Sequence, residues 1–398
     1  MSVVGWMDGE VFEANPSRSA VRWWNPGWIA VAAALTLTVA GVLAIGTTRP
    51  ELAGRQLLYG VVGLVAAAVA ATPDYRRLRR FTPVLAAGCL VLLVVVLVPA
   101  VPEWLVRPRN GARRWINLGI TDLQPSELAK VVYVLAAAAW LRPDGRHRTL
   151  LGFARPFAST MVPVALIVLE PDLGTALLFV PTLLALLFTS GARKRHLLAV
   201  VAVAALAIPA SYPLLKPHQK DRVDALIAQV QGDRRFEQDI GYQSARAMDL
   251  VGAGGLTGRG DEAAMLIEHN HLPEAHNDMI FAVIACRWGV VGAAAAMGLL
   301  AIAVGACLAT AAISRDAYGR MLAVGFGTML AVQTTVNVAM TVGIAPVTGM
   351  TLPFISFGGS SLVTTWVMVG LVLNVALRRP RSLAPRRVFD FSDDEGDR

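Results

Sequence analysis

Ten long apolar segments, separated by mostly short polar connections, constrain the fold of this chain more than any other feature. Most segments are near the length of roughly 20 residues that an α-helix needs to cross a hydrocarbon core about 30 Å thick, although the fourth and fifth are short. Only 16% of the residues are charged, whereas soluble domains contain about 25%, so the composition excludes a soluble globular protein. The sequence therefore predicts an all-α, polytopic integral membrane protein. Its ten predicted spans cover residues 28–48, 56–73, 81–102, 125–141, 156–169, 173–191, 197–215, 279–314, 321–344 and 355–377.

The distribution of Lys and Arg predicts the orientation of these spans. Basic residues are concentrated in connections that all fall on one side, at 74–80, 142–155, 193–195, 315–320 and after 377. The positive-inside rule makes that side cytoplasmic. We therefore expect two cytoplasmic tails, at 1–25 and 379–398, around a single membrane domain at 26–378. This domain includes a large extracytoplasmic loop at 216–278, between the seventh and eighth spans.

The segment 269–282, HNHLPEAHNDMIFA, concentrates polar residues just before the eighth span. We predict that Asp278 carries chemistry, because ionisable residues at a membrane edge are costly and usually face a polar cavity. One alternative is that Asp278 only caps the following helix, which stabilises a helix by about 1 kcal/mol. A second alternative is a metal site built from the three histidines. Their HxH spacing is not a helical i, i+4 pair and no HExxH motif is present, so we expect no cofactor, a divalent cation being the exception.

Two clusters in other outer connections combine charged residues with proline. The segment QPSELAK at 124–130 begins a helix at its proline and spaces Glu127 and Lys130 i, i+3, so that the two can pair. This pair either lines a site or holds two helices together. The acids Glu170 and Asp172 flank a proline, which predicts a sharp outer turn with both carboxylates near the surface. A simple solvated turn is the alternative for both acids.

Two other features of the outer side are unusual. Arg113 and Arg114 lie in the connection between the third and fourth spans, where the positive-inside rule expects few basic residues. The segment 343–361 joins the last two spans and contains two prolines and four glycines. Irregular backbone at membrane depth is tolerated only where it is buried in protein or lines a wet cavity. Both features predict a polar site at the outer face.

Five segments, taken in order, resemble the FtsW/RodA/SpoVE family, the SEDS peptidoglycan glycosyltransferases. They are RWINLG with QPSELAK, EPDLGTA, GYQ with GGLTGRG, LPEAHNDMIFAV, and PVTGMTLPFISFGGSS. The resemblance covers about residues 28–377 and implies a multi-pass protein of the bacterial cytoplasmic (inner) membrane. It also implies polymerisation of lipid II into glycan strands at the outer face, in cell elongation or division. The implied partners are lipid II, the membrane and a class B penicillin-binding transpeptidase, with no nucleic acid.

The same resemblance assigns roles to particular residues. Asp278 matches the essential aspartate of the family, and Arg114 matches the basic residue before its tryptophan. Functional positions of the family also fall on Glu127, Lys130, Asp172 and Glu274. We expect Asp278 to remove a proton from the attacking sugar hydroxyl, and Arg113 and Arg114 to hold the departing pyrophosphate. The expected substrate-binding set is completed by Gln124, Tyr242, Gln243, His276 and Ser356.

Two other functions remain open: a transporter that moves lipid II across the bilayer, and a non-catalytic scaffold of the division or elongation machinery. A transporter needs polar groups along its whole path, whereas those of this chain are concentrated at the outer edge. Arg287 replaces an acidic residue of the family, and an arginine beside Asp278 would lower the pKa of that carboxylate. The segment 346–353 combines features of the rod-shape and division branches, so the choice between them remains open.

Overall fold

The computed structural model describes residues 25–108, 112–119, 121–141, 150–210, 212–214, 220–221, 223–224, 227–228, 231 and 241–378. Apart from Asn25, the predicted tails at 1–25 and 379–398 lie outside the described residues, and so does much of the loop at 216–278.

Ten helices of the described chain correspond to the ten predicted spans. They are α1 (Pro26–Thr48), α2 (Pro50–Ala71), α3 (Tyr75–Leu97), α4 (Pro125–Trp140), α5 (Leu150–Leu169), α6 (Leu173–Thr189), α7 (Lys194–Ala210), α11 (Ile280–Ile313), α12 (Ala317–Thr341) and α13 (Gly359–Leu377). Six of them are long and apolar enough to cross a membrane, and α5 and α6 contain shorter apolar stretches. The prediction of an all-α, polytopic membrane protein is confirmed.

The remaining described elements are short and belong to connections. The strands β1 (Ile116–Asn117) and β2 (Asp122–Leu123) pair antiparallel between α3 and α4, with Ile116 opposite Leu123. The 3-10 helix η2 (Tyr212–Leu214) follows α7, and the helices α9 (Tyr242–Gly254) and α10 (Glu262–Asn270) precede α11.

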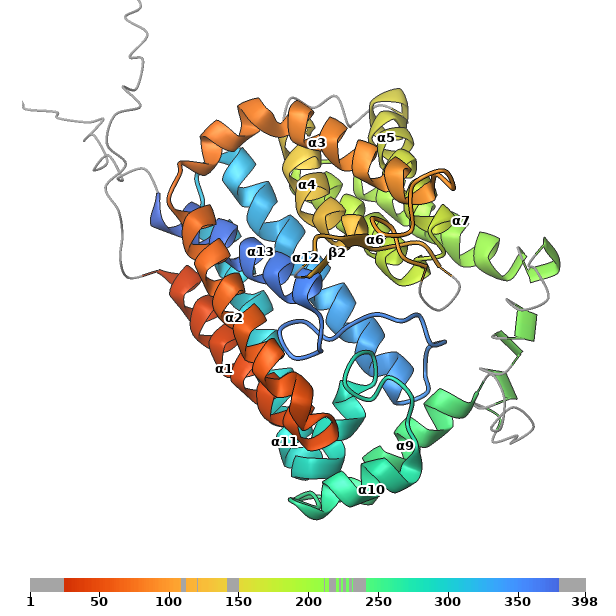
Figure 1. Ribbon diagram of the computed structural model, residues 1–398. Coiled ribbons are helices and arrows are strands. Elements are labelled where there is room, and N and C mark those ends of the chain that lie inside the picture. The colour runs from red at the N-terminus through yellow and green to blue at the C-terminus, as the bar shows by residue number, and fades with distance from the viewer. Residues whose placement is uncertain are drawn as a thin grey trace, which may run out of the picture.

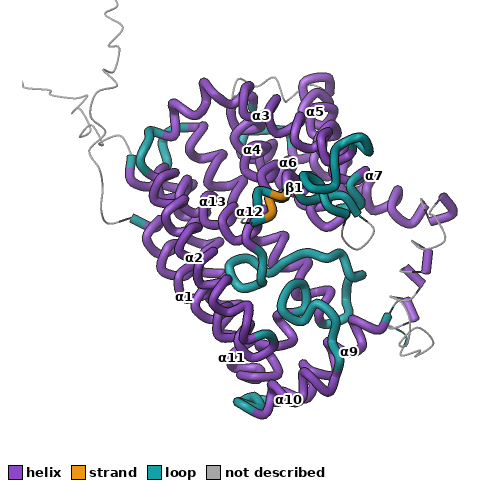
Figure 2. The backbone as a smooth tube through the Cα atoms, in the orientation of Figure 1, coloured by secondary structure: helices purple, strands orange, loops and turns teal. Residues whose placement is uncertain are grey.

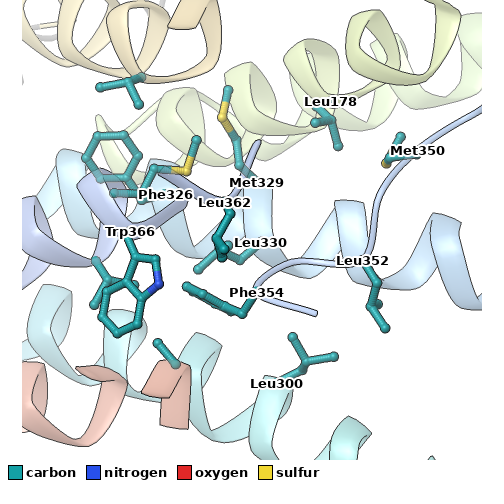
Figure 3. Packing of buried hydrophobic residues seen from close by; sticks show 14 of the residues in the cluster. Leu178, Leu300, Phe326, Met329, Leu330, Met350, Leu352, Phe354, Leu362 and Trp366 are labelled. Atoms are coloured by element: carbon teal, nitrogen blue, oxygen red, sulfur yellow. The ribbon is translucent and has the colours of Figure 1, made fainter. Parts of the chain in front are cut away.

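Helix α12 is the centre of the bundle. It packs against α11 and α13 on one side and against α4 and α6 on the other. In Figure 1, α1, α2, α11 and α13 lie to one side of α12, and α3 to α7 lie to the other. The buried core between these groups contains Phe326 of α12 and Trp366 of α13 (Figure 3). Phe354, from the connection between α12 and α13, packs its ring edge-on against Trp366 at 5.9 Å between centroids, which anchors that connection to the core.

Only α4 and α6 begin at the predicted residues, and α2, α3 and α5 each begin six residues earlier than predicted. Helix α3 begins at Tyr75 and not at 81, because the carboxylate of Asp74 accepts a hydrogen bond from the Arg76 amide at 3.0 Å and caps the helix. Helix α5 begins at Leu150 and contains Pro156, which the prediction placed at its start. Helix α13 begins at Gly359 and not at 355, because the preceding residues fold back onto the connection before α11.

Helix α11 is broken at Gly289, whose φ of 66° lies in the left-handed region. The loop between α9 and α10 replaces helical hydrogen bonds that are lost at the break. The amide of Arg259 donates to the Cys286 carbonyl at 2.9 Å, and the amide of Val290 donates to the Gly255 carbonyl at 2.9 Å. A Cβ at Gly289 would lie 2.3 Å from the Leu256 carbonyl oxygen, so only glycine fits there. The loop therefore fixes the direction of the first turns of α11.

Candidate active site

A polar cavity of about 650 Å³ lies where several helices end. Its walls come from the N-terminal ends of α2, α4, α6 and α13, from α12, from the connection between α3 and α4, and from the connections at 271–279 and 342–358. Figure 2 shows these two connections lying next to each other in the middle of the molecule. Eight of the twelve predicted site residues line the cavity: Arg114, Gln124, Glu127, Lys130, Asp172, Glu274, His276 and Asp278. Residues far apart in the sequence therefore meet in one site.

Asp278 lies half-buried at the end of the connection that leads into α11. No described residue donates a hydrogen bond to its carboxylate, and a Cβ at Gly349 would lie 3.5 Å from its Oδ2. Burial raises the pKa of Asp278 to about 7; the charges of Glu274 and Asp172 also raise it, and Arg114 opposes them. The N-cap position of α11 is occupied by Met279, so the alternative that Asp278 caps this helix is wrong.

Main-chain contacts fix the position of Asp278. The side-chain amide of Asn337 donates to the Asp278 carbonyl at 2.8 Å and to the Met350 carbonyl at 2.6 Å. Ser356 donates through its hydroxyl to the Asn277 carbonyl at 2.7 Å and accepts a bond from the Leu352 amide at 2.7 Å. Ser356 is buried and does not line the cavity. The structure thus gives Ser356 contacts that join the two connections.

Glu127 and Lys130 form a buried ion pair in the wall of the cavity. Lys130 Nζ lies 2.7 Å from Glu127 Oε2, and the two residues are 1% and 5% exposed, respectively. Lys130 also donates to Gln333 Oε1 at 3.2 Å, and Gln333 donates to the Thr351 carbonyl at 2.9 Å. The predicted pairing is confirmed, and the pair both lines the cavity and joins α4 to α12.

Asp172 is 5% exposed and caps α6, so the prediction of a carboxylate near the surface is wrong. Its Oδ1 accepts a bond from the Thr175 amide at 3.2 Å. Its Oδ2 accepts bonds from Gln124 Nε2 at 3.0 Å and from the Ser126 hydroxyl at 2.8 Å. Asp172 is buried because α4 covers the turn and supplies these donors. The carboxylate therefore ties the start of α4 to the start of α6.

The two outer arginines have different surroundings. Arg114 lines the cavity, and its guanidinium donates to the main-chain carbonyls of Glu170 at 2.8 Å and of Pro171. Arg113 is not among the lining residues and donates to the main-chain carbonyls of Pro99 and Val101 at 3.3 and 2.8 Å. The structure brings only Arg114 of this pair to the cavity.

Tyr242 and Gln243 begin α9 and are not among the lining residues. The ring of Tyr242 packs against the guanidinium of Arg246, 5.1 Å from the ring centroid.

Two further predicted residues line the cavity from the connection before α11. Glu274 accepts a hydrogen bond from the side-chain amide of Asn277. His276 packs beside Phe357, and burial lowers the pKa of its imidazole.

Two polar side chains, Arg55 and Gln333, are among the cavity residues that the sequence analysis missed. Arg55 of α2 lines the cavity and donates to the Tyr59 hydroxyl at 3.1 Å. Gln333 of α12 links Lys130 to Thr351. Each had a signal in the sequence. Arg55 is a cation in an outer connection, where the positive-inside rule expects few basic residues, and Gln333 lies i, i+4 from Asn337 on one helix face.

The model of the FtsW/RodA/SpoVE family, described as cell cycle proteins, matches residues 27–380. The chain belongs to this family. It is 31% identical to the probable peptidoglycan glycosyltransferase FtsW of Coxiella burnetii, covering 90% of this chain and 98% of that protein. It is 32% identical to the stage V sporulation protein E of Bacillus subtilis, over 81% and 86% of the two chains.

Two solved structures are similar to this FtsW/RodA/SpoVE protein. One comes from work on the structural coordination of polymerization and crosslinking by a peptidoglycan synthase complex, with a TM-score of 0.75 and 33% identity. It covers 88% of this chain and 97% of the other. The second is the rod shape determining protein RodA of Thermus thermophilus, with a TM-score of 0.65 and 31% identity over 88% and 96% of the two chains.

Arg287 lies away from the cavity of this family member. It donates to the Thr47 hydroxyl of α1 and lies 3.8 Å from Asp261. Arg114 is the only cation among the groups that shift the pKa of Asp278 in the described part of the chain, so the expectation that Arg287 lowers it is wrong. Arg287 lies about two helical turns after the start of α11, on the face that contacts α1 and the residue before α10.

The arrangement suits acid–base chemistry next to an anionic group. A carboxylate with a pKa near 7 is ionised in about half of the molecules at neutral pH and can accept a proton there. The guanidinium groups of Arg114 and Arg55 and the ammonium of Lys130 line the same cavity and can bind phosphate oxygens. Among the described residues, no group of three or more His, Cys, Asp and Glu side chains could hold a metal ion.

Proposed function

We propose that this chain is a peptidoglycan glycosyltransferase that polymerises lipid II at the outer face of the bacterial inner membrane. The observation that carries the proposal is the carboxylate of Asp278, whose pKa is about 7, in a cavity also lined by Arg114 and Lys130. The name of the Coxiella burnetii relative, a probable peptidoglycan glycosyltransferase, supports the reaction class.

In the proposed reaction, the hydroxyl oxygen of the acceptor sugar attacks the anomeric carbon of the donor, and Asp278 removes the proton of that hydroxyl. The bond from that carbon to the diphosphate breaks, and its electron pair leaves with the diphosphate oxygen. The proton remains on Asp278 until it passes to water. A general base contributes on the order of 10²–10⁴ to the rate. The leaving group needs no proton if cations balance its charge, and Arg114 and Lys130 supply them. The donor is already activated, so the proposed reaction requires no cofactor from the protein.

The position of the cavity supports the proposed orientation. The lining residues of α2, α4, α6 and α13 lie near the N-terminal ends of these helices, and those ends fall on the side that the positive-inside rule places outside. We propose that both chain termini lie in the cytoplasm. The concentration of the polar lining at one end of the bundle also favours an outer-face enzyme over a transporter.

We propose that a class B penicillin-binding transpeptidase is the partner. The similar solved structure belongs to a synthase complex that couples polymerization to crosslinking, which supports a partner that crosslinks the strands. Whether this chain serves elongation or division is decided by the transpeptidase that co-purifies with it.

The proposal is tested with the full-length protein and lipid II in detergent micelles, where no second leaflet exists. We expect glycan polymer from the unmodified protein and none from Asp278→Asn. Absence of polymer, together with movement of labelled lipid II between leaflets in vesicles, would establish a transporter. If neither polymer nor movement of lipid II is detected, the non-catalytic scaffold remains as the function.

A further inference from the structure

The turn between α5 and α6 holds a carboxyl group that the proposed reaction does not use. Glu170 is 1% exposed, although the sequence predicted a turn with this side chain near the surface. Neither carboxyl oxygen has a hydrogen-bond partner among the described residues. Burial of an ionised carboxylate without partners costs free energy, so such a group either remains protonated or has a functional role.

Two charged groups of the described chain act on this carboxyl, Asp172 at the start of α6 and Arg114 from the connection before α4, and its own charge acts on the thiol of Cys89 in α3. Burial and the negative charge of Asp172 raise the pKa of Glu170 to about 8, and Arg114 opposes them. At neutral pH the group is therefore mainly a neutral acid.

Arg114 contacts Glu170 through the main chain only. Its Nε donates to the Glu170 carbonyl at 2.8 Å, and a terminal nitrogen donates to the Pro171 carbonyl. No ion pair joins this guanidinium to the Glu170 carboxyl in the described structure. Two neutral acceptors therefore hold Arg114 in place, and its positive charge is left for the cavity that it lines.

We propose that Glu170 is a positioning residue whose neutral form keeps the charge of Arg114 available for a diphosphate group in the cavity. An ionised Glu170 would offset the positive charge of Arg114 and place another negative charge beside Asp172. Both effects weaken the binding of an anion, because charge interactions are strong where water is largely excluded. This role rests on the proposed function only in identifying the diphosphate as that of lipid II.

Inorganic pyrophosphate is the probe for the test, and calorimetry of the full-length protein in detergent gives its affinity at pH 7 and pH 9. With a pKa of about 8, the protonated fraction of Glu170 falls by about tenfold between these values, and the affinity should fall in proportion. Glu170→Gln is permanently neutral and should lose this fall. Glu268→Gln, an exposed acid of α10, is the matched control and should behave as the unmodified protein. Ionisation of the probe itself is the same for all variants and cancels in the comparison.

Glu170→Met provides a second neutral side chain in case a buried amide destabilises the turn. The proposal holds if both neutral variants bind at pH 7 and lack the extra tenfold fall. It is overturned if they weaken with pH as much as the unmodified protein does, or if the unmodified protein does not bind pyrophosphate at pH 7.

The lipid II assay separates this proposal from the proposed function. In that assay, KM of the unmodified protein should rise at alkaline pH, and KM of Glu170→Gln should not. Pyrophosphate binding with the expected pH dependence but without polymer would refute the glycosyltransferase alone.

Discussion

The side-chain amide of Asn337 bridges the main-chain carbonyls of Asp278 and Met350, at 2.8 and 2.6 Å. One residue of α12 thus fixes both the peptide that carries the proposed base and the connection that faces it. Asn374 of α13 makes a comparable bridge at the other end of the bundle, donating to the carbonyls of Ala70 and Pro73 at 2.7 and 2.6 Å. The two asparagines are both fully buried, so they form a natural pair for experiment.

We expect Asn337→Ala to lower stability and activity together. Each carbonyl that loses its donor in a buried site costs about 1–3 kcal/mol. A displacement of Asp278 by about 1 Å would lower turnover on the order of a hundredfold. Asn374→Ala should lose similar stability and retain turnover per folded molecule. Melting curves and lipid II polymerisation rates measure both effects, and equal turnover losses in the two variants would contradict the positioning role of Asn337.

Asp278→Asn should abolish polymerisation and at the same time stabilise the protein at neutral pH. The rate should fall on the order of 10²–10⁴, the usual contribution of a general base. Burial raises the pKa of Asp278 from 3.8 to about 7, so between these values the unfolded chain is ionised while the folded chain keeps its proton. Stability from this group is therefore full at low pH and is lost as the pH rises toward 7. The melting temperature of Asp278→Asn should accordingly exceed that of the unmodified protein at pH 8 and match it near pH 4.

The pH–rate profile of the unmodified protein should have two limbs. Only the ionised form of Asp278 accepts a proton, so kcat/KM should rise with pH and level off above about 7. If Glu170 acts as proposed, a second limb should fall above about pH 8. Initial rates between pH 5 and pH 10 test both limbs, and a profile that is flat from pH 5 to pH 7 would refute Asp278 as the base.

Periodicity and charge were sufficient to predict the ten helices, because each apolar segment had to satisfy its backbone internally as a helix. Proline at 125 and the i, i+3 spacing of Glu127 and Lys130 predicted the start of α4 and its ion pair. Local sequence patterns failed where contacts with residues far away in the sequence determine the position or burial of a side chain. The burial of Asp172 depends on donors from the start of α4, and Arg287 is held away from the cavity by contacts with Thr47 and Asp261.

The contributions of the Glu127–Lys130 ion pair to stability and to activity should be separable by substitution. Lys130→Met leaves the Glu127 carboxylate buried and unpaired, which costs about 3–5 kcal/mol. Adding Glu127→Gln removes that charge and should restore most of the stability. Activity should not return, because the cavity still lacks the Lys130 ammonium. Recovery of polymerisation by the double variant would show that the pair only holds α4 and α12 together.

Arg113 and Arg114 are adjacent in sequence and should differ in effect. Arg114→Ala removes a guanidinium from the cavity and should lower kcat/KM by on the order of 10²–10³, the usual effect of losing one donor to a developing charge. Arg114→Lys should recover only part of this loss, because an ammonium cannot reproduce the planar fork that contacts both carbonyls of the turn. Arg113→Ala removes bonds to Pro99 and Val101 outside the cavity, so it should lower the melting temperature and leave kcat/KM nearly unchanged. Equal losses of kcat/KM for the two alanine variants would mean that Arg113 also reaches the substrate.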